Sequence, residues 1–208
     1  MVLKKASAMS LENAPEHPYD GKGLREWLET LESQDPAARR LAARELKEFS
    51  VAAPALINAL AREPNVRVKG AILVSLQYIG GARVFEGLVP FLRSEDVGLR
   101  NGIIEILQGM PEEVSKHISS LLHDDDSDVR IFAIDILQTL AHPDTPLWLM
   151  DVIKNDEHVN VVATAIDRLI EVGNPEHLPA IEQVKVRFPN EPYISFIVDL
   201  ALQRLKGG

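Results

Sequence analysis

The stretch DDDSDVRIFAIDILQTL, residues 124–140, combines an acidic turn with the start of an amphipathic helix. After Arg130, apolar residues recur at spacings of three and four, which places them on one face of an α-helix. The same plan returns elsewhere along the chain. A repeat of nearly constant period is a stronger indication of fold than any local motif, so the chain is best aligned on this stretch.

Five segments align when Arg130 is taken as the origin of the repeat. The origin is occupied in turn by Arg39, Arg67, Arg100, Arg130 and Asn160, so that successive origins are 28, 33, 30 and 30 residues apart. Four positions before each origin stands an acid, in the order Asp35, Glu63, Asp96, Asp126 and Asp156. Three positions after it come Ala42, Gly70, Ile103, Ala133 and Ala163, four of which are small enough for closely packed helices. The period corresponds to one helical hairpin.

The acidic and arginine columns have a structural interpretation. An acid ahead of a helix can cap the free N–H groups of the first turn and complement the positive end of the helix dipole. An arginine four residues later can reach that carboxylate or the carboxylate of the adjacent repeat. We therefore expect these residues to form a structural ladder, since an active site that recurs five times would be unusual. The ladder comprises Asp35, Arg39, Glu63, Arg67, Asp96, Arg100, Asp126, Arg130 and Asp156.

Another apolar pattern of helical spacing precedes each of these segments, so each repeat contains a pair of helices. Helix breakers separate successive pairs. The breakers are Pro54, Gly80–Gly81, Pro111, Pro143 with Pro146, and Gly173 with Pro175. A sixth, less regular pair follows near the C-terminus, where Ile194 stands at the origin. The sequence predicts an all-α fold, an α-solenoid of about six antiparallel helix pairs over residues 23–208. Residues 1–22 show no sustained period and are expected to be a flexible arm.

Composition excludes several classes of function. The 208 residues are 46% hydrophobic but only 5% aromatic, and 22 basic against 31 acidic residues leave a formal charge of −9. A negative chain repels nucleic acid and anionic membranes, so neither is expected as a partner. The absence of cysteine removes disulfides and thiolate ligands, and no apolar run resembles a secretory or membrane-spanning segment. We expect a cytoplasmic protein that is monomeric by itself and needs no cofactor.

The pattern of acid, two variable residues, apolar residue, arginine, two variable residues and alanine, seen in residues 126–133, resembles the HEAT repeat. The likeness is to its short bacterial form, named after phycobilisome lyases, and covers about residues 24–206. It implies a right-handed superhelix with the second helix of each pair on the concave side. Most proteins of this kind bind other proteins.

If that geometry applies, residues one, four to five and eight after each origin face an open groove. The predicted partner-binding residues are Arg40, Arg44, Val68, Ile72, Ile104, Glu105, Gln108, Ile131, Ile134, Asp135, Gln138, Val161 and Arg168. A solvent-facing strip with this many apolar members would indicate a binding surface. The alternative is that neighbouring helices cover them, or that the assigned helical phase is shifted.

Two acidic constellations allow a chemical interpretation. Glu105 and Asp135 fall on adjacent helices, about 8–10 Å apart, and could act as paired carboxylates, although solvated acids or contacts to a partner's Lys or Arg are commoner. The aspartates at 124–128 suggest a calcium loop, yet the glycine and glutamate that such a loop requires are missing, so capping is preferred. No metal site is expected.

The sequence therefore favours a non-enzymatic adaptor or scaffold that holds another protein in its groove. One alternative is a bilin lyase or chaperone-like protein, which rests on the family resemblance alone. Another is a DNA-repair protein built on a similar helical array, which the acidic charge disfavours.

Overall fold

The computed structural model describes residues 23–206 of the chain, so the predicted arm at residues 1–22 lies outside the described residues. Within that range the regular structure is helical, with no strand. The helices belong to two compact units that meet in sequence between Leu88 and Val89. We call residues 23–88 the N-terminal unit and residues 89–206 the C-terminal unit.

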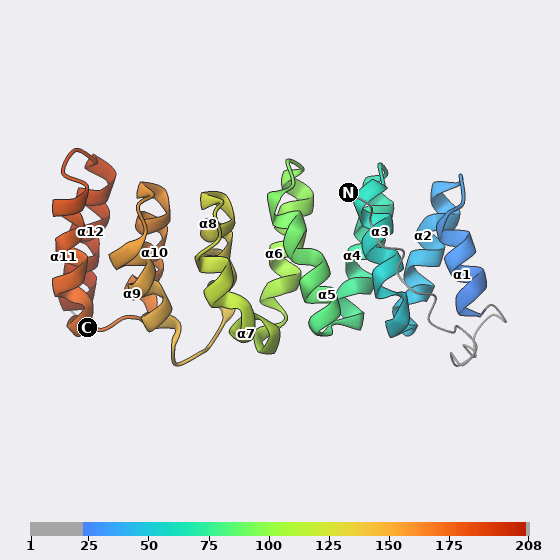
Figure 1. Cartoon of the computed structure of the whole chain (residues 1–208), viewed down its shortest axis with the longest axis horizontal. Helices are drawn as coiled ribbons and strands as arrows, with labels where there is room; N and C mark the ends of the chain where they lie inside the picture. Colours follow the sequence, from blue (N-terminus) through green and yellow to red (C-terminus); the bar gives the residue numbers. More distant parts are fainter. Residues whose placement is uncertain (1–22, 207–208) are drawn as a thin grey trace, which may run out of the picture. The chain divides into compact units, whose positions relative to one another are not determined.

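The N-terminal unit contains two helix pairs and one further helix (Figure 1). Its elements are α1 (Leu24–Leu31), α2 (Pro36–Glu45), η2 (Leu46–Glu48), η3 (Ser50–Ala52), α3 (Ala53–Arg62), α4 (Val66–Ile79) and α5 (Gly81–Leu88). Helix α1 packs on α2 and α3 packs on α4, while α2 lies beside α4 and α3 beside α5. The buried Ser75 hydroxyl of α4 donates a hydrogen bond of 2.7 Å to the Ala43 carbonyl of α2, so these two second helices are in close contact.

The C-terminal unit continues the same plan. Its elements are η4 (Val89–Arg93), α6 (Val97–Gln108), α7 (Pro111–Leu122), α8 (Ser127–Ile136), η5 (Leu137–Thr139), α9 (Thr145–Asn155), α10 (Val159–Val172), η6 (Pro175–His177), α11 (Leu178–Arg187) and α12 (Pro192–Lys206). The second helices α6, α8, α10 and α12 pack side by side in one layer, and the first helices α7, α9 and α11 form another. The all-α, helix-pair prediction is confirmed. The handedness and the continuity of one array over residues 23–208 stay predictions.

The observed helix starts correct the alignment of two repeats. The N-cap residues of the second helices are Asp35, Asn65, Asp96, Asp126 and His158, which are 30, 31, 30 and 32 residues apart. Arg39, Arg100 and Arg130 are therefore the fourth residues of their helices, whereas Arg67 and Asn160 are only second residues. The sequence alignment placed the repeats of α4 and α10 two residues too early.

This shift divides the acidic column into two structural roles. Asp35, Asp96 and Asp126 are N-caps, and their carboxylates accept hydrogen bonds of 2.9–3.1 Å from backbone N–H groups of the first turn. Glu63 and Asp156 instead stand two residues before a cap, where they accept the N–H of Asn65 and of His158, at 2.9 and 2.8 Å. The first group stabilises its own helix, and the second group is free to receive an arginine.

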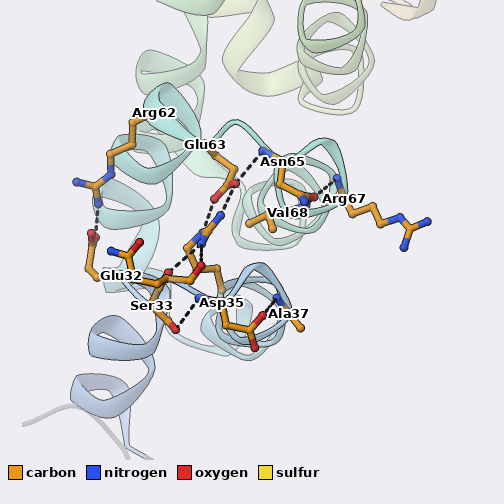
Figure 2. Close-up of polar contacts among 11 residues, drawn as sticks. Glu32, Ser33, Asp35, Ala37, Arg62, Glu63, Asn65, Arg67 and Val68 are labelled. Atoms are coloured by element: carbon orange, nitrogen blue, oxygen red, sulfur yellow. Dashed lines mark hydrogen bonds and ion pairs between the residues drawn. The ribbon is translucent and has the colours of Figure 1, made fainter.

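Arg39 joins two consecutive turns in the N-terminal unit, whose residues Ser33 and Glu63 are labelled in Figure 2. Its Nε and Nη2 donate to the two carboxylate oxygens of Glu63 at 2.7 and 2.8 Å, while Nη1 donates to the Ser33 carbonyl at 2.8 Å. The Glu63 side chain is only 4% exposed and that of Arg39 is 16% exposed. We call this arrangement, an arginine bound to a carbonyl of its own turn and to the acid of the next, the arginine clamp.

Arg130 forms the same clamp in the C-terminal unit. Its guanidinium binds both carboxylate oxygens of Asp156, at 2.7 and 3.1 Å, and the Asp124 carbonyl at 2.8 Å. Bidentate arginine–carboxylate pairs are among the stronger polar contacts in proteins. The clamp therefore fixes the spacing of α8 and α10 at the ends where both helices begin.

The ladder is interrupted at the other two arginines. Arg100 keeps the hydrogen bond to the carbonyl of its own turn, Ser94, at 2.6 Å, but the equivalent acid, Asp124, is bound by Arg93. The Arg100 guanidinium lies 5.1 Å from the centre of the Phe132 ring instead. The prediction that Arg67 belongs to the ladder is wrong, because the shifted register places its side chain along a surface hollow.

Replacing Arg39 by Met is expected to lower the free energy of unfolding more than loss of an exposed ion pair would, since it leaves the Glu63 carboxylate buried without its cation. Arg39→Met combined with Glu63→Gln should recover much of that loss, because the amide oxygen still accepts the Asn65 N–H. Urea unfolding measures both changes. Arg62→Met is the matched control, since Arg62 forms an exposed ion pair with Glu32 and should cost less than about 1 kcal/mol. Equal costs for Arg39→Met and the double variant would contradict the clamp.

The clamp also predicts a pH dependence. The hydrogen bond from Arg39 lowers the pKa of the Glu63 carboxyl below its ordinary value, despite the opposing effect of burial. Because the folded state resists protonation, this stability is fully present above the unfolded pKa of about 4.3 and is lost as the pH falls below it. In urea unfolding, the stability difference between wild type and Glu63→Gln should be constant near neutral pH and shrink below about pH 4.3. A difference that grows on acidification would show the opposite sign of linkage.

Candidate functional site

The outward side of α2 and α4 carries a group of cations around an apolar strip. Arg40, Arg44 and Lys47 follow one another at helical spacing along α2 and η2, and Arg67, Gly70, Val74 and Tyr78 do so along α4. The Lys47 ammonium lies 5.2 Å from the centre of the Tyr78 ring, which ties the two rows together. We call these seven residues the basic face. Val74 and Tyr78 are 61% and 64% exposed, so two large side chains of one helix lie in solvent on the same surface.

Two adjoining hollows lie on the basic face. One, of about 420 Å³, is lined by Arg40, Arg44, Arg67, Gly70, Ala71 and Val74. The other, of about 300 Å³, shares Arg40 and Arg67 and extends to the N-caps Asp35 and Asn65. Within residues 23–206, no carboxylate pairs with the guanidinium groups of Arg40, Arg44 or Arg67. The larger hollow is therefore apolar along its floor and positively charged at its edges.

The corresponding side of the C-terminal unit is acidic. Glu105, Asp135 and Asp167 are the ninth residues of α6, α8 and α10, the position that Arg44 and Val74 hold in α2 and α4. We call these three residues the acidic column. Burial raises the pKa of the Asp135 carboxyl above its ordinary value. Asp135 and Asp167 line a hollow of about 80 Å³ between α8 and α10.

Two of the predicted groove residues hold the second helices together. The Gln108 amide of α6 donates to the Asp135 carbonyl of α8 at 2.9 Å. From the other side, the Arg168 guanidinium of α10 donates to the Gln138 carbonyl at 2.7 Å and pairs with Glu171. Both bonds satisfy carbonyl groups near the end of α8, so they have a structural use whatever the surface binds.

The two units differ in net charge as well as in surface pattern. Residues 23–88 contain nine Lys and Arg against eight Asp and Glu, whereas residues 89–206 contain ten against twenty. The negative charge of the chain is therefore carried by the C-terminal unit. The overall value of −9 conceals a surface on the N-terminal unit that attracts anions.

The structure places the predicted groove residues in three groups. Arg44, Glu105 and Gln138 are exposed. A second group is half-buried and consists of Arg40, Ile104, Gln108, Ile131, Asp135 and Arg168. The third group is buried, with exposures of 0–1%, and consists of Val68, Ile72, Ile134 and Val161. The expectation that these last four face solvent is wrong.

The errors have two physical causes. Val68, Ile72 and Val161 belong to the repeats that were aligned two residues early, so core positions were assigned to the surface. Ile134 lies on the side of α8 that α10 covers, as residues of α10 line the same small hollow. The same shift concealed Gly70, Val74, Tyr78 and Asp167. Asn65 was the available signal for α4, because Asn is a preferred N-cap.

The acidic turn at residues 124–128 is occupied by protein contacts. Asp124 binds Arg93 and accepts the Asp126 N–H, and Asp126 caps α8. Among residues 23–206 there is no group of three or more His, Asp or Glu side chains arranged to hold a metal ion. In the same described range, no helix is both long and apolar enough to cross a membrane.

Comparison with known proteins agrees with the fold. The sequence matches the HEAT-repeat family over residues 24–108 and 114–185. Among solved structures, an archaeal HEAT-like repeats protein from Thermococcus onnurineus NA1 shares 17% identity, with a TM-score of 0.48 over 90% of this chain and 88% of that chain. The CpcE–CpcF complex of phycocyanin lyase from Nostoc sp. PCC7120 shares 16% identity, with a TM-score of 0.40 over 95% and 100%. No curated protein matches the chain.

The family match spans more than half of the sequence, and both matched regions fall on the helix pairs described above. The N-caps of the second helices recur at steps of 30 to 32 residues throughout. The chain therefore belongs to the HEAT-repeat family.

Proposed function

We propose that this protein is a non-enzymatic adaptor that binds another protein through the outward faces of its second helices. The observation that carries the proposal is the basic face, where three arginines without an acidic partner border a hollow with the exposed Val74, and the exposed Tyr78 lies beside Lys47. Arginine and tyrosine are enriched at the centres of protein interfaces, where each combines a large contact area with hydrogen-bonding groups.

The arrangement is better suited to binding than to holding the fold together. Arg39 and Arg130 occupy nearly buried sites with saturated hydrogen bonds, as structural arginines do. Arg40, Arg44 and Arg67 instead border an open hollow. A partner that supplies carboxylates would gain charge-assisted hydrogen bonds from all three.

The acidic column supports the same proposal in the C-terminal unit. A carboxylate with a pKa raised by burial is less stable in its charged form than it would be in water. A cation from a bound protein would compensate Asp135 for this lost hydration. Complementary charge also speeds association and excludes wrong partners.

Affinity capture from a lysate of the native cells, after mild crosslinking, tests the adaptor function. Val74→Gln with Tyr78→Gln alters the basic face, and Glu105→Gln with Asp167→Asn alters the acidic column. We expect wild type to retain a defined set of proteins and at least one double variant to lose them while keeping its helicity. Val186→Gln on α11, where Val186 is 73% exposed, is the control and should retain the set. Recovery of no protein above background, or of the same set by both variants, would refute the proposal.

Asp135→Asn is expected to raise the free energy of unfolding at neutral pH. Burial raises the pKa of Asp135 in the folded state, so ionisation of this carboxyl favours unfolding once the pH exceeds about 3.9, the unfolded value. The gain should therefore disappear as the pH falls below that value. Chemical unfolding at several pH values measures it, with Asp167→Asn, which alters an exposed carboxylate, as the control. A loss of stability in Asp135→Asn at neutral pH would contradict this account.

A further inference from the structure

We infer that the basic face is a docking site for an acidic protein segment whose one apolar side chain lies over Gly70, between Arg44, Arg67 and Val74. This inference rests on the proposed adaptor function and names the chemistry of the partner for one of its faces. It is carried by the position of Gly70, by the unpaired arginines and by the shape of the hollow.

Gly70 is the first observation. It is the fifth of fourteen residues in α4, and glycine in a helix interior is destabilising relative to alanine. Sequence alignment placed Gly70 at a tight contact between helices, yet a Cβ built on it would meet no atom within 4 Å. Packing inside the protein therefore gives no reason for a glycine here. A group from another molecule that approaches the α4 backbone closely would explain the glycine.

The charges around Gly70 indicate an anionic occupant. Arg40, Arg44 and Arg67 all line the same hollow. Asp35 lines the adjoining hollow, and its carboxylate accepts a hydrogen bond from the Ala37 N–H at the start of α2. Three cations gathered at one hollow repel one another, and this repulsion is relieved when carboxylates bind between them.

The floor of the hollow indicates an apolar side chain. Gly70, Ala71 and Val74 form it, and Val74 is 61% exposed in the free protein. Covering this surface with a Leu, Ile or Phe side chain would remove apolar area from water, which favours binding. The occupant therefore combines an apolar anchor with acidic residues on both sides.

The extent of the basic face indicates a segment of polypeptide rather than a compact small molecule. Arg67 and Tyr78 are eleven residues apart on α4, which corresponds to about 16 Å along the helix axis. The larger hollow lies between Arg67 and Val74, and the other adjoins it at Arg67 and continues to the helix starts at Asp35 and Asn65. A short peptide can follow such a length and contact all the cations.

The same features make nucleic acid a poorer fit. Proteins that bind single strands usually present several aromatic rings on which successive bases stack. The basic face has one ring, Tyr78, and the Lys47 ammonium already lies close to it. The track between the arginines is aliphatic, which matches an apolar side chain better than a phosphate backbone.

Selection from a library of random peptides displayed on phage tests the inference. The full chain is the bait, and the Gly70→Gln variant removes peptides that bind elsewhere. We expect the enriched peptides to share several Asp or Glu residues around one Leu, Ile or Phe. Enrichment of neutral or basic peptides, or of none, would overturn the inference.

One enriched peptide, labelled with fluorescein, then measures affinity by fluorescence anisotropy. Gly70→Gln, which fills the hollow, and Arg44→Gln, which removes a cation, should each weaken binding by at least about tenfold. Ala61→Gln on α3 is the control for Gly70→Gln, because it adds the same side chain outside the hollow. Arg83→Gln on α5 is the control for Arg44→Gln, because it removes an exposed charge elsewhere. Both control variants should bind the peptide like wild type. Wild-type affinity should also fall as salt is raised.

Gly70→Gln separates loss of binding from loss of folding. Gln favours helices more than Gly, and its Cβ would meet no atom within 4 Å, so thermal unfolding of this variant should occur no lower than in wild type. Unchanged peptide affinity in this folded variant would refute the placement over Gly70. Displacement of the peptide by a single-stranded oligonucleotide of mixed sequence would assign the face to nucleic acid instead.

The outcomes also distinguish this inference from the adaptor function. If proteins captured from lysate are lost only in the Glu105→Gln, Asp167→Asn variant and no acidic peptide is selected, the adaptor function stands and this inference fails. If neither lysate proteins nor peptides bind, both fail.

Discussion

The arginine clamp is the contact that fixes consecutive repeats relative to each other in both units, between α2 and α4 and between α8 and α10. One guanidinium, at the fourth position of a second helix, binds a carbonyl of its own turn and both carboxylate oxygens of the next turn. A bidentate pair permits little variation in distance or angle. Because the acid also accepts a backbone N–H just before the following helix, the position of one helix start determines that of the next.

The clamp and the bonds near the helix ends leave the outward positions of the second helices unconstrained. Ser75, Gln108 and Arg168 link neighbouring second helices through backbone carbonyls, and the layer of first helices covers the opposite side. The ninth residues of α2, α4, α6, α8 and α10 therefore carry little of the stability. These positions hold Arg44 and Val74 in the N-terminal unit and Glu105, Asp135 and Asp167 in the C-terminal unit, and repeat proteins use such variable surface positions for recognition.

This division explains why net charge was a poor guide to the surface. The acidic residues concentrate in residues 89–206, while the arginines of α2 and α4 gather around one hollow. A single value for the whole chain averages over these two surfaces. Recognition depends on the local potential within about one Debye length, roughly 10 Å, and not on the sum over the molecule.

The sequence by itself determined the helix pairs, their period of about 30 residues and the family, because apolar spacing, caps and breakers act over a few neighbouring residues. It did not determine the phase of α4 and α10. Arg67 and Asn160 follow an acid by four positions, just as Arg39 does, but they are the second residues of their helices and Arg39 is the fourth. Only the tertiary structure decided that Glu63 receives Arg39 while Arg67 faces solvent. It also decided that Ile134 is covered and Val74 is not, because burial depends on which neighbouring helix lies against each side chain.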